Sequence, residues 1–179
     1  MNSIKIEIAR EQDSEVIREI YQTAFPEEES AMLAKLAVDL LVEKTVPEIL
    51  SLVAREIETT LGHVAFSPVI VEFNDSAKAS ILAPLAFHPE HQQKKVGWRL
   101  IEFGIEKLKE AGFNIVFVYG DPEFYGKFGF DADTANDFPA PFDLEYPFGW
   151  QALILKDWSD KTTPAVTSCV SALSDPDLW

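Results

Sequence analysis

The stretch 81–130 constrains the fold of this 179-residue chain more than any other segment. It opens with a short apolar run, residues 81–87, which predicts a strand. Apolar side chains then recur at helical spacing, at Leu100, Ile101, Ile105 and Leu108. Residues 114–119 form a continuous apolar run that is typical of a strand buried on both faces. The sequence therefore predicts a βαβ unit.

Three features mark the junctions of this unit. Pro84 lies inside the first strand and cannot donate a ladder hydrogen bond, so we expect a bulge or an opened ladder there. Gly112 follows the helix and is expected to cap its C-terminus. Residues 92–97 lead into the helix N-terminus, where unpaired amides and the helix dipole together favour a bound phosphate.

Patterning also predicts the elements outside this unit. Before it, we expect a strand over 3–9, a helix over 13–24, a break at 25–29 and a second helix over 31–43, capped by Ser30. A hairpin of 49–57 with 61–72 and a turn over 73–80 are expected to follow. After it, we expect an irregular strand over 142–146 and a last strand over 150–155.

Three motifs in the stretch 81–130 resemble those of one enzyme family. The loop QQKKVG is similar to the Gln/Arg-x-x-Gly-x-Gly/Ala signature with which GNAT-type N-acetyltransferases hold the pyrophosphate of acetyl-CoA. Gln92 and Gly97 match it, whereas Lys95 replaces its first glycine. LAPLAFHP and GDPEFYGKFGF resemble the Leu-x-Pro-Leu-Ala-Val-His-Pro and Gly-Asp-Pro-x-Tyr-Tyr-x-x-Phe-Gly-Phe motifs of a common bacterial subgroup.

This resemblance implies the GNAT acyl-CoA N-acyltransferase fold, of the α/β (α+β) class. Its mixed central sheet of about six to seven strands is splayed at the fourth strand and flanked by about four helices. We expect residues 1–156 to form the acetyltransferase domain. Residues 157–179 are expected to form a C-terminal tail, mobile or docked on the domain or a neighbour.

The resemblance also implies transfer of an acetyl group from acetyl-CoA to an amine by direct attack. Tyr125 takes the place of the family's tyrosine that donates to the departing thiolate. The opened strand is expected to pair with the amide-bearing arm of CoA as though it were another strand. The expected cofactor-binding residues are Leu85, Ala86, Phe87, Gln92, Gln93, Lys94, Lys95, Val96, Gly97 and Trp98.

The acceptor is expected to be a small-molecule amine or a protein amine, and it is the least specified part of the site. Glu28, Glu29 and Ser67 are candidates for the acceptor cleft, the serine through its resemblance to the subgroup. No general base stands out, although Glu28, Glu29 or a water chain could serve. The three histidines, His63, His88 and His91, have suitable intrinsic pKa values.

An alternative is a non-catalytic CoA-binding or sensing protein on the same fold. The replacement of a glycine by Lys95 favours it, because a Cβ there would crowd the phosphate or force another loop conformation. The missing base favours it too. Turnover of acetyl-CoA with an amine would distinguish the enzyme from the binding protein.

Charge limits the partners of the chain. Its formal net charge is −15, which disfavours nucleic acid. Residues 92–127 carry six of the fifteen basic residues against five acidic ones, so the acidity lies elsewhere. A cationic amine is therefore the expected acceptor, with residues 27–29 close to the cleft.

Composition indicates one soluble domain, with 47% hydrophobic and 25% charged residues. No apolar run approaches the ~20 residues of a membrane helix. The single cysteine, Cys169, excludes an intrachain disulfide and suits the cytoplasm. One cysteine and three histidines show no metal-ligand spacing, so no metal is expected. A homodimer is possible, and the sequence does not decide the oligomeric state.

Overall fold

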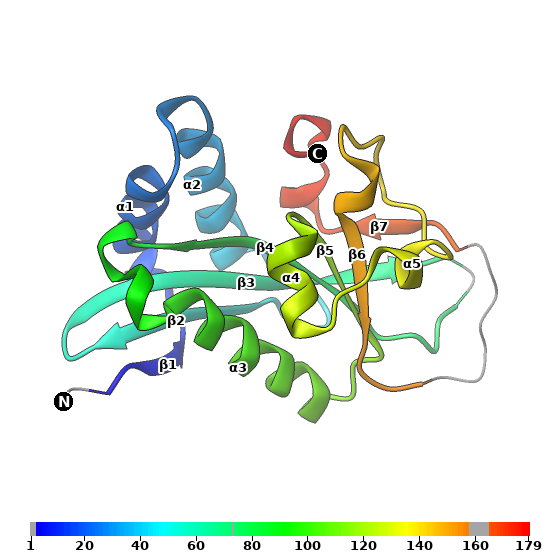
Figure 1. The fold of residues 1–179 in the computed structure, drawn as a ribbon, viewed down its shortest axis with the longest axis horizontal. Helices are drawn as coiled ribbons and strands as arrows, with labels where there is room; N and C mark the ends of the chain where they lie inside the picture. The colour runs from blue at the N-terminus through cyan, green and yellow to red at the C-terminus, as the bar shows by residue number, and fades with distance from the viewer. Residues whose placement is uncertain (1–2, 73, 158–164) are drawn as a thin grey trace. The chain divides into compact units, whose positions relative to one another are not determined.

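The computed structural model describes residues 3–72, 74–157 and 165–179, and Figure 1 shows its ribbon. Phe73 of the predicted turn and residues 158–164 of the predicted tail lie outside the described residues. The chain divides into two compact units. The first unit comprises residues 1–66 and 84–106, and the second comprises residues 67–83 and 107–179.

The described strands form a seven-stranded mixed sheet in the order β1-β2-β3-β4-β5-β6, with β7 paired to β3. They are β1 (Lys5–Ile8), β2 (Leu50–Glu56), β3 (Thr59–Val71), β4 (Ala79–Phe87), β5 (Ile115–Tyr119), β6 (Trp150–Ile154) and β7 (Thr167–Cys169). The β4–β5 pair is parallel, whereas β1–β2, β2–β3 and β5–β6 are antiparallel. The predicted mixed sheet is confirmed.

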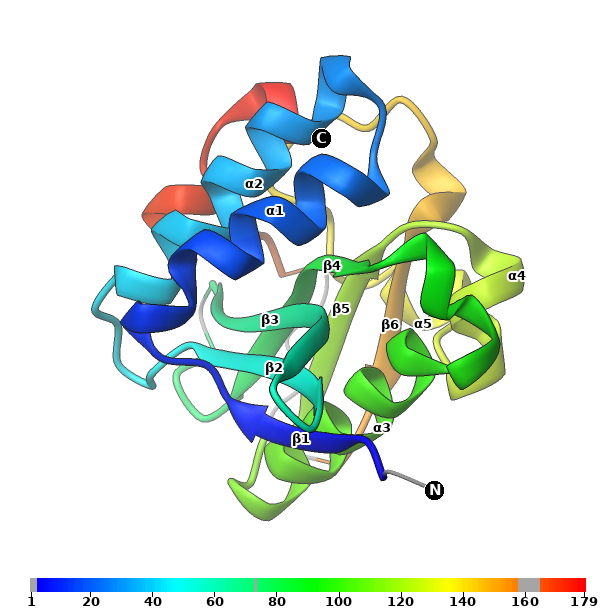
Figure 2. The ribbon, with the colours of Figure 1, turned by 90° about the vertical axis from the view of Figure 1, so that its left-hand side faces the viewer.

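The helices of the described chain are α1 (Ser14–Ala24), α2 (Glu27–Val42), α3 (Val96–Glu110), α4 (Pro122–Tyr125) and α5 (Ala132–Ala135). In the first unit, α1 and α2 lie side by side (Figure 2). Their buried residues Ile17, Ile20 and Ala37 share a core cluster with Val53 of β2. In the part of the chain that is described, no helix is long and apolar enough to cross a membrane.

The predicted start of the second helix is wrong. Helix α2 begins at Glu27, directly after Pro26, so Ser30 lies inside the helix and is not its cap. Residues Glu28 and Glu29 therefore belong to the first helical turn. The physical reason is that carboxylates near a helix N-terminus interact favourably with the helix dipole, so the acidic run starts the helix instead of breaking it.

The β2–β3 hairpin forms as predicted, with a tighter turn. Glu56 pairs with Thr59, which leaves Ile57 and Glu58 as the connection. Ile57 has a φ of 56°, a left-handed conformation that is unusual for a β-branched residue. The register also shifts between Ala54 and Arg55, which indicates a bulge near the hairpin end.

Strand β4 continues through Pro84, while its ladder with β5 opens. Among the described residues, the parallel register runs from Ala79↔Ile115 to Leu82↔Val118 and ends there. Residues 83–87 extend beyond that register. This end of the ladder lies two residues before Pro84, as expected for a residue that cannot donate a hydrogen bond.

Two glycines bring α3 close to neighbouring strands of the first unit. A Cβ on Gly104 would lie 2.1 Å from the Phe66 ring of β3, and a Cβ on Gly97 would lie 2.8 Å from the Phe87 ring of β4. The two glycines are seven residues apart and so share a helix face. Larger residues at these positions would push α3 away from the strands.

The C-terminus of α3 is capped as predicted. Gly112 has a φ of 79°, and its N–H donates to the carbonyl of Lys109. The next residue, Phe113, donates to the carbonyl of Leu108, and both of these side chains are buried. This pair of hydrogen bonds is a Schellman motif.

The predicted strand over 142–146 is wrong, because the structure has bends there. Pro141 and Pro147 bracket the segment and cannot donate ladder hydrogen bonds. The described part of the tail is docked: β7 pairs with residues 69–71 of β3. At the C-terminus, the Trp179 indole stacks on Tyr119 at 6.3 Å and donates to the Leu173 carbonyl. The division of the chain at residue 156 stays a prediction.

A buried hydrogen-bond network joins α1 to the hairpin. His63 is fully buried, with Nδ1 2.8 Å from the Tyr21 hydroxyl and Nε2 2.8 Å from the Ser51 hydroxyl. Burial lowers the pKa of His63 to about 3, although the charge of Asp13 acts in the opposite direction. The folded protein therefore holds a neutral imidazole.

This network predicts acid sensitivity. Below its ordinary pKa of 6.5, His63 takes up a proton in the unfolded chain but not in the folded one. The free energy of unfolding should then fall by about 1.4 kcal/mol for each pH unit, down to about pH 3. We expect His63→Gln to be less stable at neutral pH but to lose less stability on acidification, as measured by urea unfolding. Equal pH dependence in both proteins would contradict this account.

Candidate functional site

The loop before α3 ends in a left-handed residue. The 3₁₀ helix Pro89–Lys94 is followed by Lys95, which has φ 54° and ψ 38°. The Lys95 N–H donates to the Gln92 carbonyl at 3.2 Å, and its carbonyl accepts from Arg99 at 3.0 Å. Left-handed backbone costs most residues ~1–2 kcal/mol and suits glycine best. Lys95 thus adopts a conformation that glycine favours, at the position where the GNAT signature has its first glycine.

The first turn of α3 packs closely on the end of β4. Gly97 is buried, and only a residue without a Cβ fits at this distance from the Phe87 ring. Val96 is also buried, beside Gly62 of β3. In a 15-residue helix that begins here, the amides of Val96 and Gly97 have no acceptor within the helix and point along its axis, out of its N-terminus. Together with the helix dipole, these amides have the arrangement that favours a bound anion.

Side-chain charges at the loop are partly neutralised. Gln92, Gln93, Lys94 and Lys95 are exposed, and Trp98 is half-buried. The Lys94 ammonium lies 2.6 Å from a carboxylate oxygen of Glu56, at the end of β2. Within residues 3–72, 74–157 and 165–179, Lys95 forms no ion pair. Sequence reasoning missed Glu56, because no local signal connects two residues that are 38 positions apart.

The end of β4 carries the other three predicted cofactor residues. Ala86 is buried, whereas Leu85 and Phe87 are half-buried. The strand ends at Phe87, and the N–H of the next residue, His88, donates to the Leu61 carbonyl of β3 at 2.9 Å. Residues 85–87 thus lie past the β5 register and directly before the loop.

Tyr125 lies at the end of α4, in the second unit. Asp121 caps this helix by accepting from the Glu123 N–H at 2.9 Å. The Tyr125 ring packs edge-on against Phe124 and Phe130, at 5.0 and 5.9 Å. A Cβ on Gly120 would lie 2.5 Å from the same ring, so this glycine of the GDPEFY motif makes room for the tyrosine.

The Tyr125 hydroxyl stays protonated. Burial, and secondly the charge of Asp121, raise the pKa of Tyr125 to about 12. In the described structure the hydroxyl has no hydrogen-bond partner. The group can therefore donate a hydrogen bond across the physiological pH range, but it is a poor proton acceptor.

The acceptor candidates lie in different surroundings. Glu28 and Glu29 are exposed on the first turn of α2. Ser67 is fully buried in the second unit, and its backbone carbonyl accepts from the Ser80 hydroxyl at 3.0 Å. Its own hydroxyl is the one buried side-chain oxygen or nitrogen without a hydrogen-bond partner in the described chain. A buried hydroxyl in this state costs ~1–3 kcal/mol.

The three histidines do not supply an evident base. His63 is enclosed by its network, and its low pKa leaves it neutral. His88 and His91 are half-buried and lie edge to face at 6.3 Å, at the start of the 3₁₀ helix. No cluster of His, Cys, Asp or Glu that could hold a metal occurs among the residues whose structure is described.

The backbone of Lys95 gives a stability prediction. Lys95→Gly removes the left-handed strain, but it also loosens the unfolded chain, so we expect a change between zero and about 1 kcal/mol of stabilisation. Lys95→Val should destabilise by about 1–2 kcal/mol. Gln93→Gly, at an exposed neighbouring position, is the control and should cost about 0.5–1 kcal/mol. Urea unfolding measures the stability of all three variants. If Lys95→Gly and Gln93→Gly lose the same free energy of unfolding, the left-handed strain at Lys95 is contradicted.

Comparison with known proteins finds relatives in one family. The model of the acetyltransferase (GNAT) domain matches residues 5–132. Over 139 residues, the chain is 36% identical to the "Uncharacterized N-acetyltransferase YjhQ" of Escherichia coli (strain K12), which covers 76% of this chain and 75% of that protein.

Two crystal structures have a similar fold. The GNAT family N-acetyltransferase YhbS from Escherichia coli, in complex with CoA, has a TM-score of 0.80 and 27% identity, and covers 97% of this chain and 92% of its own. A GNAT family acetyltransferase from Brucella melitensis, in complex with acetyl-CoA, has a TM-score of 0.73 and 24% identity over 97% of this chain and 100% of its own. With a family model that matches most of its length, the chain belongs to the GNAT acetyltransferase family.

Proposed function

We propose that this protein transfers the acetyl group of acetyl-CoA to a cationic amine by direct attack. The observation that carries the proposal is the left-handed Lys95, which starts α3 as the signature glycine would and leaves the first helix amides available to an anion. Its similarity to YhbS, whose crystal structure contains CoA, supports the same cosubstrate.

The pyrophosphate of acetyl-CoA would bind at the N-terminus of α3. Amides of Val96 and Gly97 donate to it, with the residues around them completing the loop. These surrounding residues are Gln92, Gln93, Lys94, Lys95 and Trp98. Lys95 is exposed and can approach a phosphate directly. Lys94 would have to exchange its pairing with Glu56 for the phosphate, or share it.

The amide-bearing arm of the cosubstrate would pair with the end of β4. Peptide-like groups add to an open strand through main-chain hydrogen bonds. Backbone groups of Leu85 and Phe87 are the partners that we propose, with Ala86 buried between them. An amide near Phe87 would also face the thioester oxygen and stabilise the negative charge that develops on it.

Tyr125 would act as a hydrogen-bond donor to the sulfur. The acceptor first loses a proton to solvent, and the neutral amine nitrogen then attacks the carbonyl carbon. The carbon–sulfur bond breaks, negative charge collects on the leaving thiolate, and the nitrogen gives up its second proton to solvent. An ordinary thiol has a pKa of ~8.5, so full transfer from a tyrosine of pKa about 12 would be uphill by about 5 kcal/mol. A hydrogen bond that strengthens as the charge develops avoids this cost.

For the acceptor, we propose a cationic amine attracted by the acidic surface. Glu28 and Glu29 are exposed and would interact with an ammonium group before it loses its proton. The unpaired hydroxyl of Ser67 is a further candidate for a contact within the second unit, because a ligand group could satisfy it.

Turnover tests the proposed function against a binding protein without activity. We expect free thiol to be released from acetyl-CoA in the presence of at least one polyamine-like acceptor, and more slowly with acidic amine acceptors. Gly97→Glu should abolish both turnover and the rise in melting temperature caused by CoA, because it adds bulk against Phe87 and negative charge at the phosphate site. Gly126→Glu is the matched control for the melting-temperature shift alone, since a side chain there meets no atom within 4 Å.

Two results would contradict the proposal. Thermal stabilisation by CoA without turnover on any amine of a broad panel would favour the binding protein. If CoA raises the melting temperature of Gly97→Glu as much as that of the original protein, the pyrophosphate does not bind at this helix N-terminus.

Tyr125→Phe tests the donor. Removing the hydroxyl should lower kcat about a hundredfold while the dissociation constant of CoA changes less than about twofold, because the hydrogen bond matters mainly as the thiolate forms. Stopped-flow thiol release and calorimetry measure the two quantities. Equal losses in kcat and CoA affinity would instead indicate that Tyr125 only packs the turn.

A further inference from the structure

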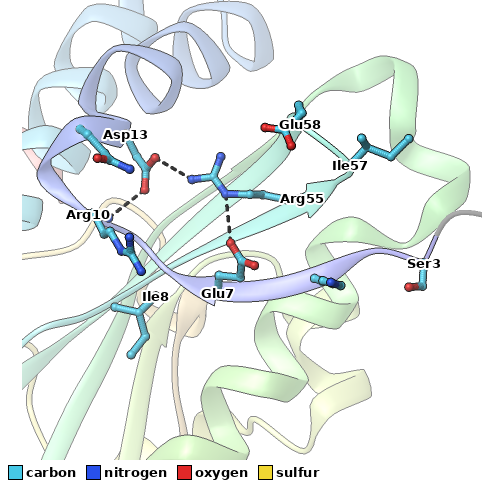
Figure 3. Close-up of a pocket in the computed structure, with 10 residues that line it drawn as sticks. Ser3, Glu7, Ile8, Arg10, Asp13, Arg55, Ile57 and Glu58 are labelled. Atoms are coloured by element: carbon cyan, nitrogen blue, oxygen red, sulfur yellow. Dashed lines mark hydrogen bonds and ion pairs between the residues drawn. The ribbon is translucent and has the colours of Figure 1, made fainter.

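The first unit contains a cavity that the proposed acetyl transfer does not use. It has a volume of about 740 Å³ and lies over β1 and the end of β2 (Figure 3). Small-molecule sites typically measure roughly 300–1,000 Å³. Its lining is mostly charged or polar, and the charged side chains are Lys5, Glu7, Arg10, Asp13, Arg55 and Glu58.

Two cations face each other across the strands of this cavity. Lys5 of β1 lies directly opposite Arg55 of β2 in the antiparallel register. Like charges in this arrangement destabilise a sheet unless anions separate them. The bulge between Ala54 and Arg55 falls at the same place.

Arg55 is already neutralised by the protein. Its guanidinium contacts Glu7 at 3.3 Å and Asp13 at 2.6 Å (Figure 3). It also donates to the Thr60 hydroxyl at 2.6 Å. Asp13 also accepts from the backbone N–H of Arg10 at 2.8 Å, so the backbone of Arg10 is fixed at the wall. Glu7 and Asp13 are thus both engaged by Arg55, and neither forms an ion pair with Lys5.

Three charged side chains of the lining are exposed to solvent, namely Lys5, Arg10 and Glu58. Across residues 3–72, 74–157 and 165–179, no ion pair forms at Lys5, Arg10 or Glu58. This leaves two positive groups and one negative group facing a cavity of ligand size. Such a set complements a molecule with two carboxylates and one ammonium group.

We propose that this cavity is a second ligand site, which binds a small amino-dicarboxylate with its carboxylates on Lys5 and Arg10 and its ammonium group on Glu58. The site is independent of the loop before α3. Side chains alternate along a strand, so Glu56 points to the opposite face from Arg55 and pairs with Lys94 of that loop. Binding in the cavity therefore needs neither CoA nor acetyl transfer.

Calorimetry with three related compounds tests the site in the full chain. L-Glutamate carries both carboxylates and the ammonium group, glutarate lacks the ammonium group, and 4-aminobutyrate lacks one carboxylate. We expect glutamate to bind most tightly, with millimolar affinity or better, and each of the other two about tenfold more weakly or worse. Added CoA should leave the glutamate affinity unchanged.

Variants assign the contacts. Lys5→Gln and Arg10→Gln should each weaken glutamate at least about tenfold. Glu58→Gln should weaken glutamate but not glutarate, which a general loss of folding could not mimic. Lys44→Gln, which removes an exposed lysine that makes no ion pair in the described chain, is the charge-matched control and should bind normally. The proposal is overturned if none of the compounds binds at millimolar concentration, or if Lys44→Gln weakens glutamate as much as Lys5→Gln.

Discussion

The close approach of α3 to the end of β4 is the constraint on which the candidate site depends. Gly97 can lie against the Phe87 ring only because it has no Cβ, and the left-handed Lys95 turns the chain into the helix at that point. Backbone amides of the first helical turn then collect beside a strand end that extends past its register with β5. The anion site that we propose therefore rests on backbone geometry and not on basic side chains.

Charge acts on this site in two opposing ways. A chain with a net charge of −15 would repel an anionic cosubstrate at long range and would attract the cationic acceptor that we propose. Near the loop, the pairing of Lys94 with Glu56 reduces the local positive charge, while Lys95 stays exposed. Local hydrogen bonds from helix amides are little screened by salt, so they can hold a phosphate where the overall field does not favour it.

The sequence predicted those features that local rules determine. The βαβ unit and the cap at Gly112 follow from apolar periodicity and from the backbone freedom of one glycine. The start of α2 was predicted wrongly, because a run of acidic residues can start a helix as well as break one. The Lys94–Glu56 pair and the cavity around Arg55 depend on residues far apart in sequence that strand pairing brings together, so no local pattern could reveal them.

Amide chemical shifts test the central claim most directly, namely that backbone groups at the start of α3 bind the cosubstrate. In ¹⁵N-labelled protein, saturating CoA should move the amide resonances of Val96 and Gly97 most, together with those of Leu85 and Phe87. Their hydrogen exchange should slow by at least about tenfold. If CoA binds while these four amides keep their shifts and exchange rates, the backbone site at this helix N-terminus is wrong.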